Sequence, residues 1–153
     1  MQRIASFSVN HDLLDKGMYI SRIDGDVVTY DIRMKKPNTG DILGNGELHT
    51  IEHLFATYAR NSLFSPEVIY VGPMGCRTGF YLLLRDRISP MDAIRLTRES
   101  MAFIAGFTGR IPGSSRRECG NYRDHDLTGA RRIAADMLKV LENWDESSLQ
   151  YKE

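Results

Sequence analysis

Two histidines and a glutamate stand together in one short segment, His49-Thr50-Ile51-Glu52-His53. On a helix, residues four apart share a face, so both imidazoles would project one turn from each other with the carboxylate beside them. Two neutral imidazoles at this spacing can chelate a divalent ion, and a neighbouring carboxylate can move protons. The order is that of the H-x-x-E-H metal-hydrolase motif. It predicts a metal site, and a merely solvated helix face is the alternative.

A third metal ligand has to come from elsewhere, and two candidates lie close together in the sequence. The thiolate of Cys119 would bind zinc or ferrous iron well. His125, six positions later, is the alternative ligand, and a buried packing role for Cys119 is a further one. Two histidines and one cysteine would leave a tetrahedral ion with one open position, as catalytic sites have.

The second cysteine, Cys76, lies in a connector rich in special residues, Gly72-Pro73-Met74-Gly75-Cys76-Arg77-Thr78-Gly79. A cation beside a thiol lowers its pKa, so that the thiol can take up and return a proton near neutral pH. The spacing alone does not distinguish a nucleophile from a base, and simple packing remains a third interpretation.

The elements that would position these residues are indicated by periodicity and turn signals. Strands are predicted at residues 18–23, 27–34, 67–71 and 80–85, as two hairpin-like pairs. In the second of these runs Thr29, Asp31 and Arg33 alternate with apolar residues, which predicts one face in water. Residues 1–9 also alternate like a strand.

Three helices are predicted, at about residues 47–61, from the N-cap Ser89 to residues 106–109, and from after Asp126 to about Trp144. Hairpins with appended helices indicate an α+β fold rather than an alternating parallel one. We therefore expect a single domain over residues 1–153, with a mostly antiparallel four-stranded sheet packed against three to four helices.

Composition excludes several classes of function. Twenty basic residues balance twenty acidic ones, so no net field attracts nucleic acid or an anionic membrane. No apolar run is long enough to span a membrane, and the N-terminus lacks the apolar stretch of a signal peptide. We expect a cytoplasmic protein, in which both cysteines stay reduced and are free for metal binding or catalysis.

Together these stretches resemble the S-ribosylhomocysteine lyase (LuxS) family in order, spacing and total length. The matching stretches are Ser6-Phe7 with His11, Tyr30-Asp31-Ile32-Arg33, His49-Thr50-Ile51-Glu52-His53, Pro73-Met74-Gly75-Cys76-Arg77-Thr78-Gly79-Phe80-Tyr81, and Cys119-Gly120 with His125-Asp126-Leu127. The combination covers nearly the whole chain and is far more specific than the His-Glu-His motif alone.

The resemblance implies a homodimer with active sites at the subunit interface, each holding one ferrous ion that zinc or cobalt can replace. It implies a small-molecule substrate, S-ribosylhomocysteine, cleaved by carbonyl migration and β-elimination. The products would be homocysteine and 4,5-dihydroxy-2,3-pentanedione, the precursor of the quorum-sensing signal autoinducer-2. The implied roles are metal binding for His49, His53 and Cys119, acid–base catalysis for Glu52 and Cys76, ribose contacts for Ser6, His11 and Arg33, and a homocysteine contact for Arg60.

One position departs from the family pattern, and two other functions compete. Tyr70 stands where the family carries an acidic residue at the homocysteine end of the pocket. An H-x-x-E-H metallopeptidase would use Glu52 to activate water and a downstream carboxylate such as Glu99. A metal-stabilised binding module would instead have a closed four-ligand site that adds His125.

Overall fold

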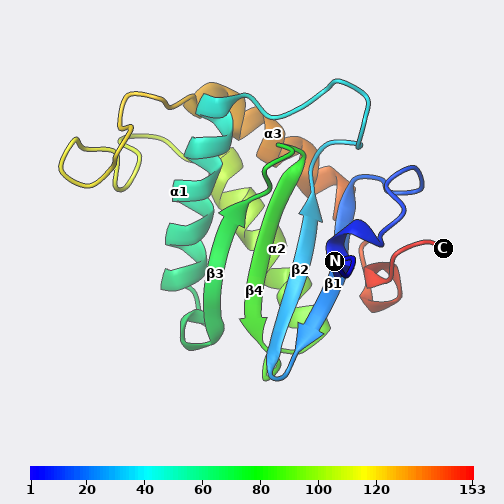
Figure 1. Cartoon of the computed structure of the whole chain (residues 1–153). Helices are drawn as coiled ribbons and strands as arrows, with labels where there is room; N and C mark the ends of the chain where they lie inside the picture. The colour runs from blue at the N-terminus through cyan, green and yellow to red at the C-terminus, as the bar shows by residue number, and fades with distance from the viewer.

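A four-stranded antiparallel sheet forms the centre of the protein, whose computed structural model describes all 153 residues (Figure 1). The strand order is β1-β2-β4-β3. The strands are β1 (Gly17–Asp24), β2 (Val27–Arg33), β3 (Val68–Pro73) and β4 (Gly79–Arg85). All four lie within two residues of their predicted bounds, and the hairpin of β1 and β2 is confirmed by the pairing of Asp24 with Val27.

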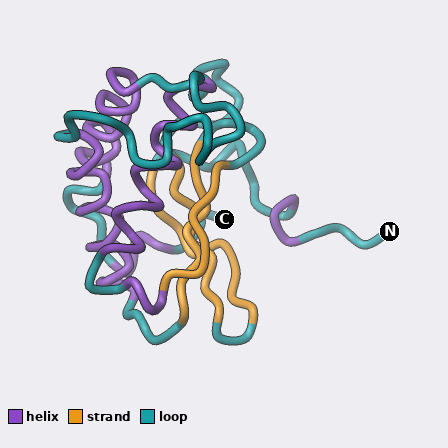
Figure 2. The backbone as a smooth tube through the Cα atoms, turned by 90° about the vertical axis from the view of Figure 1, so that its left-hand side faces the viewer, coloured by secondary structure: helices purple, strands orange, loops and turns teal.

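Three helices pack on one face of the sheet, as Figure 2 shows from the side. They are α1 (Asn45–Asn61), α2 (Pro90–Ala105) and α3 (Leu127–Val140). A core of 27 buried residues lies between sheet and helices. Short three-ten turns occur at Ala5–Phe7, Ser65–Glu67 and Glu146–Leu149. The predicted α+β fold is confirmed, and no helix is both long and apolar enough to cross a membrane.

The two residues predicted to precede the N-termini of α2 and α3 form the hydrogen bonds expected of helix caps. The Ser89 hydroxyl accepts a hydrogen bond from the backbone N–H of Asp92 at 3.1 Å, ahead of Pro90 in the first turn of α2. The Asp126 carboxylate likewise accepts from the N–H of Gly129 at 2.8 Å at the start of α3. These caps fix where α2 and α3 begin relative to the long segment between them, residues 106–126.

Two sequence predictions about chain ends were wrong. Residues 1–9 form no strand; they contain the three-ten turn Ala5–Phe7 and extend away from the sheet (Figure 2). Helix α3 ends at Val140 and not near Trp144. The Arg98 guanidinium donates hydrogen bonds to the carbonyls of Leu141, Glu142 and Trp144, and these long-range bonds hold the residues that follow the helix against α2.

The prediction of a water-facing side on β2 was also wrong for its charged residues. Asp31 and Arg33 do alternate with core residues, but they are only 1% and 3% exposed. Arg33 forms a buried ion pair with Asp31 at 2.7 Å, and the Tyr151 hydroxyl covers the same carboxylate. The face of the sheet that does not pack against the helices therefore carries a charge pair that is shielded from water.

Candidate metal centre and active site

The two histidines of α1 face the segment of residues 106–126 and are each held by one of its carbonyl oxygens. His49 Nδ1 lies 2.7 Å from the carbonyl oxygen of Asp124, and His53 Nδ1 lies 2.8 Å from that of Pro112. Because each Nδ1–H donates to a carbonyl, each Nε2 keeps its lone pair. The ring planes are 85° apart, so the two lone pairs can converge on one ion.

Cys119 brings a sulfur to the same place. Its Sγ lies 3.4 Å from His49 Nε2 and accepts a hydrogen bond from the N–H of Asn121, which suits a thiolate. Nitrogen and sulfur ligands of one tetrahedral zinc ion would lie roughly 3.6 Å apart, given bonds of about 2.0 and 2.3 Å. Both the donor set and the spacing thus fit a divalent ion such as zinc or ferrous iron.

His125 completes the group of side chains around this point. The donor atoms of His49, His53, Cys119 and His125 all lie within 4.8 Å of one another. His125 Nδ1 contacts the Thr50 hydroxyl at 2.9 Å, while its Nε2 is buried without a hydrogen-bond partner. Burial, and then the neighbouring His49 and His53, lower the pKa of His125, so its ring stays neutral.

The orientation of the His125 ring differs from that of a ligand sharing an ion with His49. The two rings are stacked, with centroids 4.0 Å apart and planes inclined by only 17°. A coordinating lone pair lies in the plane of its imidazole, so nearly parallel stacked rings do not aim both lone pairs at one ion about 2.0 Å away. The sequence left Cys119 and His125 as alternatives; the structure brings both to the centre, and this geometry favours Cys119.

A pocket of about 400 Å³ opens beside the metal centre, between α1 and β3. Glu52 and His53 line one end, and Arg60 lies two helical turns, or about 12 Å, further along α1. The Arg60 guanidinium donates to the carbonyl of Ile69 at 2.8 Å and has no ion-pair partner. The pocket therefore offers a carboxylate near the metal ligands and a cation at its other end.

Tyr70 forms the wall of this pocket on the side of β3. Its ring lies over Gly72, where an added Cβ would come within 2.3 Å of the ring carbons. The side chain is 53% exposed and faces the same pocket as Arg60. Tyr70 thus gives this wall of the pocket an aromatic surface.

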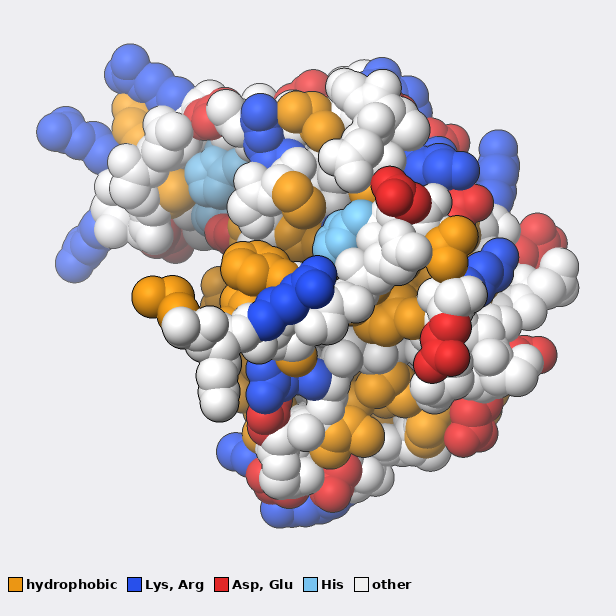
Figure 3. Space-filling model, turned by 45° about the vertical axis from the view of Figure 1, so that its right-hand side comes forward, with side chains coloured by type: hydrophobic (Ala, Val, Ile, Leu, Met, Phe, Trp, Pro, Cys, Tyr) orange, Lys and Arg blue, Asp and Glu red, His pale blue; other side chains and the backbone are white.

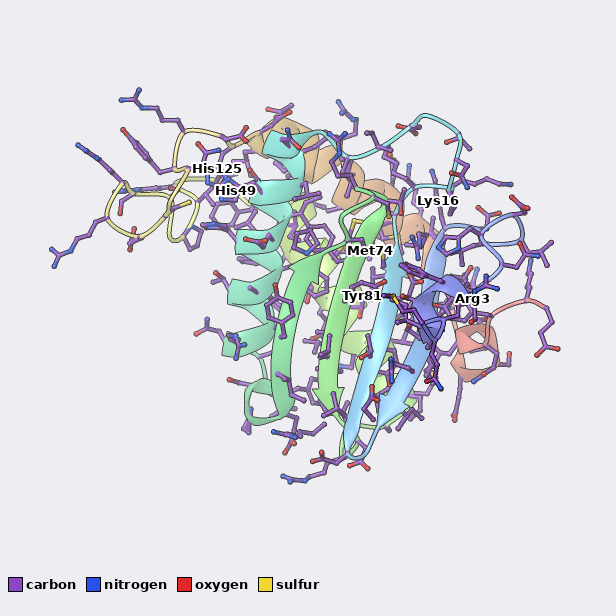
Figure 4. The ribbon with its side chains drawn as sticks, in the orientation of Figure 1. Arg3, Lys16, His49, Met74, Tyr81 and His125 are labelled. Carbon is purple, nitrogen blue, oxygen red and sulfur yellow. The ribbon has the colours of Figure 1, made fainter.

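The Cys76 thiol belongs to a separate group of residues, at the turn between β3 and β4. Thr78 Oγ1 lies 3.0 Å from Cys76 Sγ, and Arg33 Nη1 lies 2.7 Å from Thr78 Oγ1 and 3.8 Å from the sulfur. Neither Cys76 nor Arg33 lines the pocket of Glu52. Figure 4 likewise shows His49 at the outer side of α1, away from Tyr81 on the sheet.

The N-terminal residues predicted to bind the ribose do not line the pocket beside the metal ligands. Ser6 is within the three-ten turn, and His11 Nδ1 lies 2.9 Å from the carbonyl oxygen of Val9. This part of the chain shares a shallow pocket with Tyr151, whose hydroxyl reaches Asp31. Figure 3 shows histidine side chains in two separate patches on one face, as expected from two groups of site residues.

Comparison with known proteins agrees with this arrangement. The family model described as S-ribosylhomocysteinase (LuxS) matches residues 4–148. The chain belongs to the LuxS family. It is 47% identical to the S-ribosylhomocysteine lyase of Clostridium acetobutylicum over the full length of both chains. It is also 46% identical to that of Phocaeicola vulgatus, with 99% of this chain and 98% of the relative covered, and 45% identical to that of Desulfotalea psychrophila, with 99% of each covered.

The position of Glu99 removes the structural basis for a peptidase. Glu99, the candidate carboxylate for that function, accepts hydrogen bonds from Tyr58 at 3.2 Å and from Arg95 at 2.9 Å on the outer side of α2. It does not line the pocket of Glu52. The carboxylate that a peptidase would need is therefore engaged elsewhere.

Four residues near the site were not singled out by sequence reasoning. Thr50 and Thr78 lie inside the motifs that contain His49 and Cys76. Their closeness in sequence to these site residues could have indicated that they contact the site. Asp31 could have been recognised as the partner of Arg33, two residues along the same strand face. Tyr151 has no local signal at all, since its contact with Asp31 joins residues 120 positions apart.

Proposed function

We propose that this protein is an S-ribosylhomocysteine lyase, which cleaves its substrate to homocysteine and 4,5-dihydroxy-2,3-pentanedione. The observation that carries the proposal is the His49, His53 and Cys119 donor set beside a pocket with Glu52 at one end and Arg60 at the other. The full-length similarity to proteins of that name supports it.

The pocket suits an amino-acid thioether attached to a sugar. The Arg60 guanidinium, which has no carboxylate partner, binds the substrate carboxylate, and the exposed face of Tyr70 lies beside the ammonium or the sulfur. The ribose then reaches the metal end. His49, His53 and Cys119 would hold a ferrous ion there, which zinc or cobalt could replace, and the ion would supply a Lewis acid for the sugar oxygens.

The reaction needs groups that move protons at different carbons. The sugar carbonyl has to migrate from C1 to C3 before the thioether carbon C5 becomes β to it. Each migration transfers a proton between adjacent carbons, and the last step removes the C4 proton as homocysteine leaves with the C5–S electron pair. Glu52 acts from the metal side of the substrate and Cys76 from the other.

We propose further that two chains complete each site. In a homodimer, the metal ligands, Glu52 and Arg60 come from one chain, and Cys76 with Arg33, Ser6 and His11 from the other. The proposal rests on the separation of Cys76 from the pocket and on the exposed apolar N-terminal residues Ile4 and Phe7, which are 52% and 66% exposed. The two free thiols agree with a reducing cytoplasm.

The test is release of free thiol from S-ribosylhomocysteine by protein purified without oxygen, stripped of metal, and then reloaded with ferrous iron. Thiol release that depends on the metal is expected, together with formation of the diketone product. Metal binding without any thiol release would overturn the proposal. A protein that unfolds on chelation and holds the ion in a closed four-ligand site would instead be a structural binding module.

A further inference from the structure

A continuous chain of hydrogen bonds leads from the C-terminal segment to the Cys76 thiol. The Tyr151 hydroxyl lies 2.6 Å from Asp31 Oδ2. Arg33 donates to both oxygens of the same carboxylate, at 2.7 and 3.1 Å. Its third nitrogen donates to Thr78 Oγ1 at 2.7 Å, and that oxygen lies 3.0 Å from Cys76 Sγ.

The direction of every bond made by Asp31 and Arg33 is fixed by chemistry. A guanidinium only donates and a carboxylate only accepts, so Asp31 receives three hydrogen bonds, two from Arg33 and one from Tyr151. Since the Thr78 oxygen already accepts from Arg33, its own proton is free to donate to the sulfur of Cys76. The Thr78 hydroxyl and the Arg33 guanidinium, which lies 3.8 Å from the sulfur, can therefore stabilise a negative charge on Cys76.

Because Asp31 is buried, the hydrogen bond from Tyr151 at the start of this series matters for the stability of the carboxylate. Asp31 and Arg33 are almost inaccessible to water, so every oxygen of the carboxylate that lacks a protein donor stays unsatisfied. Burial and the Asp31 charge raise the pKa of Tyr151, which therefore remains a donor throughout the pH range of activity. Its ring is also stacked on Tyr19, with centroids 5.1 Å apart.

We propose that Tyr151 is a positioning residue for Cys76: by holding Asp31, it fixes Arg33 where the guanidinium and the Thr78 hydroxyl stabilise the thiolate. Without the tyrosine hydroxyl, the buried carboxylate keeps only its two hydrogen bonds from Arg33, so it attracts the guanidinium more strongly and weakens the bond from Arg33 to Thr78. The consequence for turnover rests on the proposed acid–base role of Cys76. The consequence for thiol reactivity does not.

The test compares wild type with Tyr151→Phe, which keeps the stacked ring and removes only the donor. The rate of Cys76 alkylation by iodoacetamide is measured against pH on metal-loaded protein, with peptide mapping to separate Cys76 from Cys119. We expect the rate of Cys76 alkylation at pH 7 to fall about threefold to tenfold in Tyr151→Phe, because the thiolate that reacts is less well stabilised.

The charged and titratable groups around the thiol limit what else can shift its profile. They are Arg33 and Asp31 from β2, Tyr81 from β4, and Tyr151 from the tail. The pKa of Tyr81 is raised mainly by burial, so the Tyr81 hydroxyl adds no charge beside the thiol near neutral pH. A matched control is Tyr58→Phe, which removes a hydrogen bond from a tyrosine to a carboxylate on α2. We expect it to leave the profile unchanged.

A second variant separates positioning from an unrelated structural effect. Thr78→Val removes the hydroxyl between Arg33 and the sulfur, so adding Tyr151→Phe to it should cause a much smaller further fall in rate than in the wild-type background. Superimposed profiles for wild type and Tyr151→Phe, or falls in rate that simply multiply in the double variant, would overturn the proposal. Because alkylation needs no substrate, a lowered alkylation rate in Tyr151→Phe together with no release of homocysteine by the wild type would refute the lyase function alone.

Discussion

Mixing two inactive variants tests whether each active site is built from two chains. His49→Ala removes a metal ligand, and Cys76→Ala removes the thiol on the separate surface at the turn between β3 and β4. In a mixed dimer, one site combines the intact metal half of the Cys76→Ala chain with the intact thiol of the His49→Ala chain. The other site carries both defects. One active site in two is therefore expected per mixed dimer.

The size of the rescue follows from this count. Random exchange of equal amounts makes about half of the dimers mixed, so thiol release should recover to about a quarter of wild type. Mixed dimers purified with two different affinity tags should reach about half. Co-expression of both variants supplies the material, and release of homocysteine thiol is the assay.

A pair of variants with defects in the same half provides the control. Chains carrying His49→Ala and His53→Ala leave every metal half incomplete, so their mixture should stay inactive. Verified mixed dimers of His49→Ala and Cys76→Ala that show no activity would refute the shared site. Full activity in a monomeric fraction of the wild-type protein would do so as well.

Three further outcomes follow from individual contacts. Cys119→Ala should lose both bound metal and activity, whereas Cys76→Ala should keep the metal and lose turnover, as metal analysis and thiol release would reveal. Tyr70→Asp should lower the Michaelis constant by roughly threefold to tenfold, because it adds a partner for the substrate ammonium; an unchanged constant would count against that role. Gly79→Ala should destabilise by about 1–3 kcal/mol in urea unfolding, since its Cβ would meet a β2 carbonyl oxygen at 2.1 Å, while Gly75→Ala, with open space, should not.

Local signals in the sequence were enough to predict the sheet and the histidine pair of the metal centre. The bounds of β2, the Ser89 cap and the four-residue spacing of His49 and His53 each depend on neighbours along the chain, and each appears as expected. Such patterns predict the structure well because periodicity and capping depend on only a few neighbouring residues.

What the sequence could not predict depends on contacts between distant segments. Asp31 was expected in water because its strand alternates, but it is buried and accepts a hydrogen bond from Tyr151, 120 positions away. The residues after α3 are held by Arg98 from another helix. The choice between Cys119 and His125 required the ring orientation of His125, which no spacing encodes.

The carbonyls that hold the two α1 histidines have a consequence for metal affinity. Pro112 and Asp124 belong to the segment of residues 106–126, which also supplies Cys119 and has no helix or strand of its own. An ion bound by His49, His53 and Cys119 would therefore fasten this segment to α1, and part of its binding free energy would be used to order the segment. The dissociation constant measured for the metal is then a property of the segment as much as of the ligands: a substitution that stiffens residues 106–126 would tighten metal binding without touching a single donor atom.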